Sequence, residues 1–330
     1  MKAGIKNNFF LVVVLFSAVL WSCNDQEYIS LTGKTMGTYY SIQYQSDQNY
    51  SEEIDSILTN FISAASTYDS TSEISEFNRT GFLNYRTPHL YKMLSIAKRI
   101  HRETNGAFEP TLMPIINAYG FGYSKKKNIS DSLIESLLTN VSFSLIEFDN
   151  INMKAVKKNV QLDLSAMGEG YAIDMISAFL NRQGVTNYKV EIGGEMKCSG
   201  NNSKGEAWLI GVENPLKNNT NTTVLGYVRL ADESISTSGT ARKFYLDETG
   251  KKISHIINPK TGWPIENSLL SVTIRSKNAV DADAFATACM VMGLDSAKTF
   301  IERSGLSGLI VYQKNGVTKI WHSTGFFNSI

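Results

Sequence analysis

The stretch VQLDLSAMGEGYAIDM, residues 160–175, changes its hydrophobic period half-way along. Apolar and polar residues alternate up to Leu164, which is the pattern of a strand. Small residues follow from 165 to 170, and apolar residues at helical spacing then predict a helix over 171–183. Backbone groups at such a strand-to-helix junction can hold phosphate or a metal, although a plain connection is the more common case. Asp163, the last polar side chain before the junction, is therefore a candidate ligand.

Strands and helices do not alternate along the chain as they do in nucleotide-binding folds, and the sequence contains no glycine-rich nucleotide loop. A hairpin is expected over 152–164, with its turn at 157–159. Helices are expected at 54–66, 90–104, 129–140, 171–183, 281–292 and 297–303. Strands are expected at 31–45, 188–197, 208–212, 223–230, 243–246, 253–257, 309–312 and 317–322. Strands with helices inserted between them favour an α+β fold with an antiparallel sheet, in one or two lobes.

The N-terminus has the pattern of a targeting segment. Lys2 and Lys6 precede an apolar run at 9–20, which is too short to span a bilayer but suits a signal peptide. The run ends in Leu20-Trp21-Ser22-Cys23, which resembles a bacterial lipobox. We expect a signal peptide at 1–22, a tether at 23–30 lipidated on Cys23, and one functional domain at 31–330. The protein would then be extracytoplasmic and anchored to a bacterial membrane, on the periplasmic face; an ordinary secreted protein is the alternative.

Composition excludes some classes of function. The formal net charge is +1, and without the two lysines of the signal peptide it becomes 30 − 31 = −1. No helix rich in Lys or Arg is present, so a nucleic-acid partner is not expected. Cys289 lies in an apolar helical run and is expected in the core. A disulfide with Cys198 remains open.

Asp283 and Thr287 are four residues apart in the segment DADAFATACMVMG, so they share one face of the predicted helix. A carboxylate and a hydroxyl suit a hard cation such as Mg²⁺, although a solvated polar edge is the more common reading of such a pair. Asp281 is expected to cap the N-terminus of this helix.

Two other stretches carry candidate chemistry. The adjacent Gly193 and Gly194 predict a bulge in a strand or a close approach to a ligand. His255 precedes a turn at 258–264 that contains two prolines. Its ordinary pKa of about 6.5 suits proton transfer near neutrality, but a rigid surface turn with an incidental histidine explains the pattern equally well.

The stretches described above and several others, taken together in their order along the chain, resemble one family. This is the family of FAD:protein FMN transferases, or ApbE family, of flavin-trafficking lipoproteins. The resemblance extends over nearly all of the chain after the signal peptide. The matching segments are Thr35-Met36-Gly37-Thr38, Ser66-Thr67-Tyr68, Gly106-Ala107-Phe108-Glu109, 163–174, Gly193-Gly194, Thr237-Ser238-Gly239, His255-Ile256-Ile257-Asn258-Pro259, Thr261-Gly262 and 283–287.

The resemblance implies a T-fold-related α+β architecture and two sets of site residues. The FAD site would be lined by Met36, Tyr68, Ala107, Phe108, Glu109, Asp163, Glu169 and Ile257. Mg²⁺ would be held by the backbone carbonyl of Ala166 and by Asp283 and Thr287. The family often has Asp at positions 109 and 258 and Lys at position 169, so Glu169 replaces a cation with an anion beside the diphosphate.

The implied reaction is attack by a Thr or Ser hydroxyl of a target flavoprotein on the FMN-side phosphorus of FAD, with AMP leaving. His255 is the candidate general base, and Tyr68 is expected to cover the flavin ring and limit the access of water. Two alternatives use the same site: an Mg²⁺-dependent FAD pyrophosphatase that releases FMN and AMP, and a non-catalytic FAD-binding lipoprotein.

Overall fold

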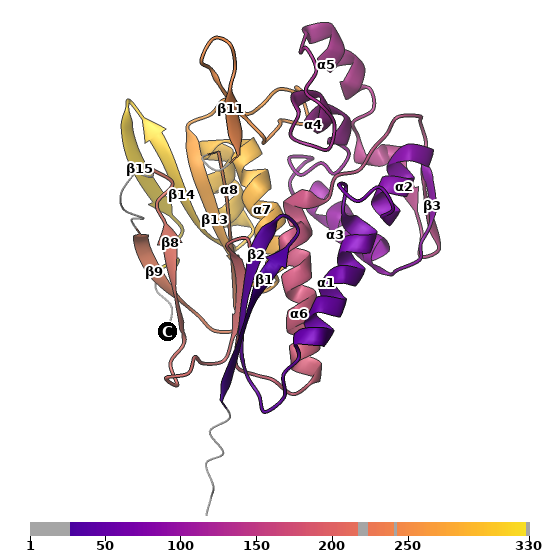
Figure 1. Ribbon diagram of the computed structural model, residues 1–330. Coiled ribbons are helices and arrows are strands. Elements are labelled where there is room, and N and C mark those ends of the chain that lie inside the picture. Colours follow the sequence, from indigo (N-terminus) through magenta and orange to yellow (C-terminus); the bar gives the residue numbers. More distant parts are fainter. Residues whose placement is uncertain (1–26, 217–223, 241–242, 328–330) are drawn as a thin grey trace, which may run out of the picture.

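The computed structural model describes residues 27–216, 224–240 and 243–327. Its centre is an antiparallel sheet of eight strands in the order β1-β2-β6-β7-β10-β13-β14-β15 (Figure 1). These strands are β1 (Tyr28–Thr35), β2 (Thr38–Gln45), β6 (Tyr188–Ile192), β7 (Glu195–Ser199), β10 (Glu233–Gly239), β13 (Leu269–Ser276), β14 (Ser307–Lys314) and β15 (Val317–His322). The α+β fold with an antiparallel sheet is therefore confirmed.

Helices gather on one side of this sheet (Figure 1). The outer helices are α1 (Ser51–Ala65), α2 (Glu73–Thr80), α3 (His89–Glu103), α4 (Met113–Tyr119) and α5 (Asp131–Leu138). Two others, α6 (Gly168–Arg182) and α7 (Ala279–Met292), contact both the sheet and the outer helices, and α8 (Leu294–Arg303) follows α7. Because α6 and α7 lie between the two layers, their inward residues are held from both sides.

The smaller elements complete the molecule. A three-stranded sheet of β3 (Phe82–Asn84), β5 (Asn152–Ala155) and β4 (Ile146–Phe148) contacts α2 through β3, and two hairpins form separate two-stranded sheets. The hairpins are β8 (Trp208–Glu213) with β9 (Val224–Leu230), and β11 (Phe244–Leu246) with β12 (Lys252–Ser254). The short 3₁₀ turns are η1 (Phe143–Leu145) and η2 (Ser165–Met167).

The predicted helices are present because their apolar stripes reach the core. In α1, the side chains of Ile54, Leu58 and Phe61 recur at helical spacing and are all buried. The other predicted helices also form, with ends displaced by a few residues. Cys198 and Cys289 are both buried and free, so the core position of Cys289 is confirmed and no disulfide joins the pair.

The predicted hairpin over 152–164 is wrong in its second arm. Residues 160–164 alternate in burial as a strand would, but they form no strand and pair with none of the described strands. The side-chain amide of Asn78 in α2 takes that place: its Nδ2 donates to the carbonyl of Leu162 (2.9 Å), and its Oδ1 accepts from the Leu162 N–H (2.7 Å). An extended segment can therefore have strand periodicity without belonging to a sheet.

The paired glycines are a hairpin turn, not a bulge within one strand. Gly193 and Gly194 both have positive φ and connect β6 to β7, which pair with each other. The predicted single strand over 188–197 is therefore two strands. The single strand predicted over 31–45 is likewise two strands, β1 and β2, joined by a turn at Met36 and Gly37.

The expected cap of α7 is also wrong. Asp281 lies in the first turn of α7 and forms an ion pair with Arg99. The free N–H groups of Ala279 and Val280 donate instead to the carboxylate of Asp174 in α6 (3.1 and 3.0 Å). The two helices cross closely, since a Cβ on Gly170 would lie 2.4 Å from the Ala279 carbonyl oxygen.

The signal peptide and the lipobox with Cys23 lie outside the described residues. The end of the predicted tether, from Tyr28 onward, already belongs to β1. Among the helices that the structure describes, none has the length and apolar character needed to cross a membrane.

Candidate active site

A cavity of about 870 Å³ lies where the turn between β1 and β2, the end of α1, the start of α6, the end of β10 and α7 meet. Every site residue selected from the sequence lines it. These are Met36, Tyr68, Ala107, Phe108, Glu109, Asp163, Ala166, Glu169, His255, Ile257, Asp283 and Thr287. Residues far apart in the sequence therefore converge on one space, although their individual roles remain predictions.

Asp283 and Thr287 lie on one face of α7, as their spacing predicts. Asp283 is only 6% exposed, and its carboxylate accepts a hydrogen bond from the Gly170 N–H at the start of α6 (3.0 Å). Burial raises the pKa of Asp283 well above its ordinary range, and the nearby carboxylates of Glu195 and Glu169 raise it further. A cation beside Asp283 would favour its charged form.

Thr287 is oriented by a neighbour from the sheet. Its Oγ1 lies 2.7 Å from the Ser238 Oγ in β10, so the two hydroxyls share a hydrogen bond. The donor set at this end of the cavity is thus one carboxylate, one hydroxyl and the adjacent Ala166 backbone. In the described ranges, no group of three or more His, Cys, Asp or Glu side chains is arranged to hold a metal ion. Any cation here would rely on main-chain, hydroxyl and water oxygens besides Asp283.

Glu169 and Asp163 add negative charge beside this end. Burial raises the pKa of both carboxyl groups, and the positive charge of Lys243 opposes that shift in each. Asp163 also accepts hydrogen bonds from the Ser165 N–H (2.9 Å) and hydroxyl (3.0 Å), which fix its orientation. Lys243 lines the same cavity, so it supplies positive charge where Glu169 does not.

His255 is held in one tautomer. Its Nδ1 lies 2.9 Å from the backbone carbonyl of Lys243, which can only accept, so Nδ1 carries the proton. The neutral ring therefore has its lone pair on Nε2. Burial lowers the pKa of His255, and the Lys243 charge acts in the same direction while the carbonyl bond opposes it. Phe121 lies edge-on to the ring at 6.2 Å between centroids.

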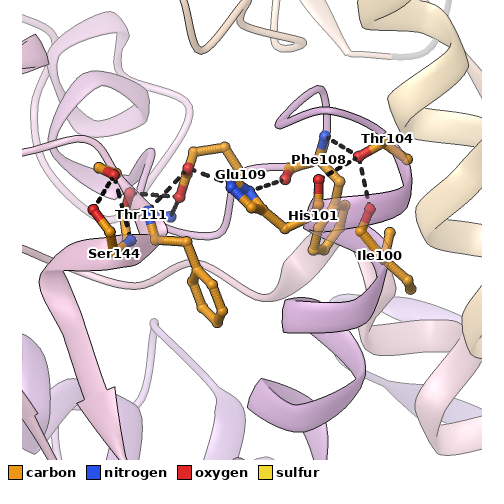
Figure 2. Close-up of polar contacts among 9 residues, drawn as sticks. Ile100, His101, Thr104, Phe108, Glu109, Thr111 and Ser144 are labelled. Carbon is orange, nitrogen blue, oxygen red and sulfur yellow. Dashed lines mark hydrogen bonds and ion pairs between the residues drawn. The ribbon is translucent and has the colours of Figure 1, made fainter.

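Glu109 lies in a different wall and has its hydrogen bonds satisfied by the protein (Figure 2). Its carboxylate accepts from the Thr111 N–H (3.0 Å), the Thr111 hydroxyl (2.6 Å) and the Phe143 N–H (3.1 Å). The His101 Nδ1 lies 3.5 Å away and donates to the Phe108 carbonyl at 2.9 Å. Glu109 therefore shapes the bend that presents Phe108, and its side chain is only 5% exposed.

Tyr68 lies at the open part of the cavity. The residue is 67% exposed, and its hydroxyl donates to the Phe121 carbonyl at 3.3 Å. One ring face is thus available to a flat ligand while the hydroxyl stays bonded. Phe121 also packs against Tyr245 of β11, with 5.3 Å between ring centroids.

Three cavity residues were missed by the sequence reasoning as functional candidates: Glu195, Ser238 and Lys243. Glu195 follows the paired glycines, Ser238 belongs to the Thr-Ser-Gly segment, and Lys243 lies shortly after that segment. The available signal was therefore proximity to these stretches, not residue type.

Comparison with known proteins agrees with this geometry. The ApbE family profile matches residues 36–310. The chain belongs to the ApbE family. It is 33% identical to a FAD:protein FMN transferase of Haemophilus influenzae, over 94% of each chain. It is 31% identical to one of Escherichia coli K12, over 90% of this chain and 87% of the other.

Solved ApbE structures are similar along nearly their whole length. The flavin transferase ApbE from Vibrio cholerae superimposes with a TM-score of 0.81 at 30% identity, over 91% of this chain and 98% of that one. The apo flavinyl transferase ApbE from Pseudomonas stutzeri gives 0.83 at 27% identity, over 92% and 98%. Membership of the ApbE family makes this chain a transferase enzyme.

Proposed function

We propose that this chain is an Mg²⁺-dependent FAD:protein FMN transferase. It attaches FMN from FAD, through a phosphoester, to a threonine or serine of a target flavoprotein and releases AMP. The names of its relatives support the transferase class. The observation that carries the proposal is one cavity of about 870 Å³ that is lined by Asp283, Thr287 and His255. Cavities of that size accommodate ligands as large as a dinucleotide.

The residues at the α7 end fit Mg²⁺. Asp283 is buried, with a raised pKa and, within the described chain, a single hydrogen bond to its carboxylate. Asp283, Thr287 and the Ala166 carbonyl would hold the ion, which would neutralise phosphate charge and the departing AMP oxygen. Ser238 would keep the Thr287 hydroxyl oriented, and the Gly170 N–H would keep the carboxylate in place.

His255 would accept the proton of the incoming hydroxyl at Nε2, because Nδ1 is committed to the Lys243 carbonyl. The acceptor oxygen forms a bond to the FMN-side phosphorus, and the bond from that phosphorus to the AMP oxygen breaks. The electron pair of that bond leaves with AMP, and the proton passes to His255. A positioned base contributes roughly 10²–10⁴-fold to such a step.

A second candidate, FAD pyrophosphatase activity, has one observation in its favour. Tyr68 is 67% exposed, so the open part of the cavity is accessible to water unless the acceptor covers it. Attack by water on the same phosphorus would release FMN and AMP. Storage of FAD without turnover has less support, since the relatives carry the names of enzymes.

Residues 1–22 and Cys23 would place the reaction outside the cytoplasm. The positive N-terminus, the short apolar run and the lipobox-like ending support a lipid anchor on Cys23, and the acceptor would lie on the same side of the membrane. Mass spectrometry of the mature N-terminus decides this. A chain that starts elsewhere without lipid would rule out the anchor.

The transferase proposal is tested by incubating the mature chain with FAD, Mg²⁺ and a candidate acceptor subunit. We expect the acceptor to gain one FMN on a threonine or serine, located by tandem mass spectrometry, with release of AMP. An acceptor with that residue changed to valine is the matched control. Release of AMP and free FMN with an unmodified acceptor would favour the pyrophosphatase, and no AMP at all would contradict both.

A further inference from the structure

The central sheet is interrupted at the cavity. The β6–β7 hairpin stops at the Gly193-Gly194 turn, where the Gly193 N–H donates to the Tyr39 carbonyl of β2 (3.0 Å). On the other side, β7 pairs with β10 only from Glu233 to Ile235. Ser236 still lies beside β7, where its hydroxyl donates to the Glu195 carboxylate (3.5 Å). β10 continues to Gly239, and no described strand pairs with this edge from Thr237 onward.

The direction of the β10 backbone follows from its pairing with β13. The Thr240 N–H donates to the Leu270 carbonyl (3.2 Å), and in antiparallel pairs every second residue bonds to the same neighbour. Ser238 therefore bonds to β13, whereas the N–H and C=O groups of Thr237 and Gly239 point to the other side. The hydroxyls of Thr237 and Thr273 lie 2.9 Å apart, which fits a non-hydrogen-bonded pair.

This edge, with which no described strand pairs, lies in the wall of the cavity, since Thr237, Ser238 and Gly239 all line it. The Ser238 side chain points toward α7, where its hydroxyl meets Thr287. Residues directly opposite each other in a sheet project to the same face. A residue placed opposite Ser238 on an added strand would therefore point its side chain toward Thr287 and Asp283.

We infer that the acceptor protein binds as an extended strand along this edge of β10, with its reacting threonine or serine opposite Ser238. The inference rests on the proposed function and identifies how the protein substrate is held. Alternating donors and acceptors along a strand edge match an extended peptide, which supplies its own main-chain groups at the same spacing. The pairing places the hydroxyl beside the α7 residues without recognising any particular neighbouring side chain.

The geometry fixes which acceptor amides matter. The residues just before and just after the reacting one would lie opposite Thr237 and Gly239 and exchange main-chain hydrogen bonds with them. The N–H groups two residues away on either side would point away from β10. The effect of removing a main-chain N–H group of the acceptor on its binding should therefore alternate from one residue to the next. Recognition through side chains would not produce this alternation.

The test uses a synthetic peptide that contains the FMN-labelled threonine of the acceptor subunit together with its flanking residues. In this peptide, single amide N–H groups are replaced by ester oxygens. If the short peptide is not labelled, the same esters are introduced into the intact subunit by ligation. An ester at either neighbouring residue should raise KM for the acceptor by roughly 2- to 10-fold with little change in kcat. Esters two residues away are the matched controls and should have little effect.

Equal effects at all four positions, or none at the neighbouring ones, would overturn the strand pairing while leaving the transferase intact. No FMN on the unmodified peptide or subunit would instead contradict the transferase proposal, and the pairing with it. Amide hydrogen exchange over 233–240 gives a second measurement. Protection should appear on adding acceptor; full protection by FAD alone would assign the edge to the nucleotide and overturn the inference.

Discussion

Asp283 and Glu109 are two buried carboxylates in different walls of one cavity, and the protein treats them differently. Glu109 accepts three hydrogen bonds from Thr111 and Phe143 and lies beside His101 (Figure 2). From the described part of the chain, Asp283 accepts one, from Gly170, and it lies near Glu195 and Glu169. Burying a carboxylate is costly unless its charge is compensated. Donors of the protein itself compensate the charge of Glu109, whereas the charge of Asp283 is left for a ligand to compensate.

The largest effect is expected for Asp283→Asn, which removes the uncompensated charge. Loss of the charge should weaken Mg²⁺ binding and leave the phosphate poorly neutralised, so FMN transfer should fall by roughly 10³-fold. The fold should persist, because an amide at this position can still accept from Gly170. Transfer rates at saturating Mg²⁺, with circular dichroism as the folding control, decide the matter; near-normal turnover would show that Asp283 does not act through a metal.

His255→Asn should have the next largest effect, a loss of roughly 10²-fold in transfer, because the proton acceptor is removed. The pH profile gives a separate readout. Since burial and the Lys243 charge lower the pKa of His255, its neutral form persists at lower pH. The acid limb of kcat/KM should therefore lie below the ordinary histidine pKa of about 6.5 and disappear in the variant. An acid limb that survives in the variant would assign it to another group.

Glu109→Gln tests the other wall. An amide donor would face the N–H and hydroxyl donors around Glu109, so the free energy of unfolding should fall by about 1–3 kcal/mol. Transfer at saturating FAD should fall far less than in Asp283→Asn. Urea unfolding and kcat measured on the same samples separate the two effects. A loss of turnover as large as that of Asp283→Asn, with unchanged stability, would place Glu109 among the reacting groups.

The smallest effect is expected for Tyr68→Asn, at the exposed part of the cavity. Removing the ring should give water better access, so acceptor labelling should slow while release of free FMN rises a few-fold. Both products are measured under the same Mg²⁺ and FAD concentrations. If the ratio of transferred to free FMN does not fall, Tyr68 is a packing aromatic.

The sequence predicted helices better than the central strands. In α1, apolar residues at helical spacing recur because one face meets the core. β10 was missed because it is rich in serine, and Ser234 and Ser236 are nevertheless buried. These small side chains face α7, which is itself rich in alanine, so strand and helix approach closely. β13 was missed as well, because half of its residues are polar although most of them are buried.

For the site, the resemblance identified the stretches that converge, but not the bonds within them. The tautomer of His255 depends on the Lys243 carbonyl, and the different surroundings of Glu109 and Asp283 depend on residues far away in the chain. Such contacts follow from the fold, so no local pattern could have indicated them. The role of Asn78 beside residues 160–164 is a further case, because a side chain there takes the place of a strand.

The central claim is that the Asp283 wall takes a metal ion and that the cavity then transfers FMN to a protein. The most direct measurement follows AMP, free FMN and acceptor-bound FMN together in one reaction as Mg²⁺ is titrated. The account predicts that AMP and acceptor-bound FMN rise in equal amounts with Mg²⁺ and that both stop when a chelator is added. AMP matched only by free FMN, or transfer that continues in the chelator, would contradict it.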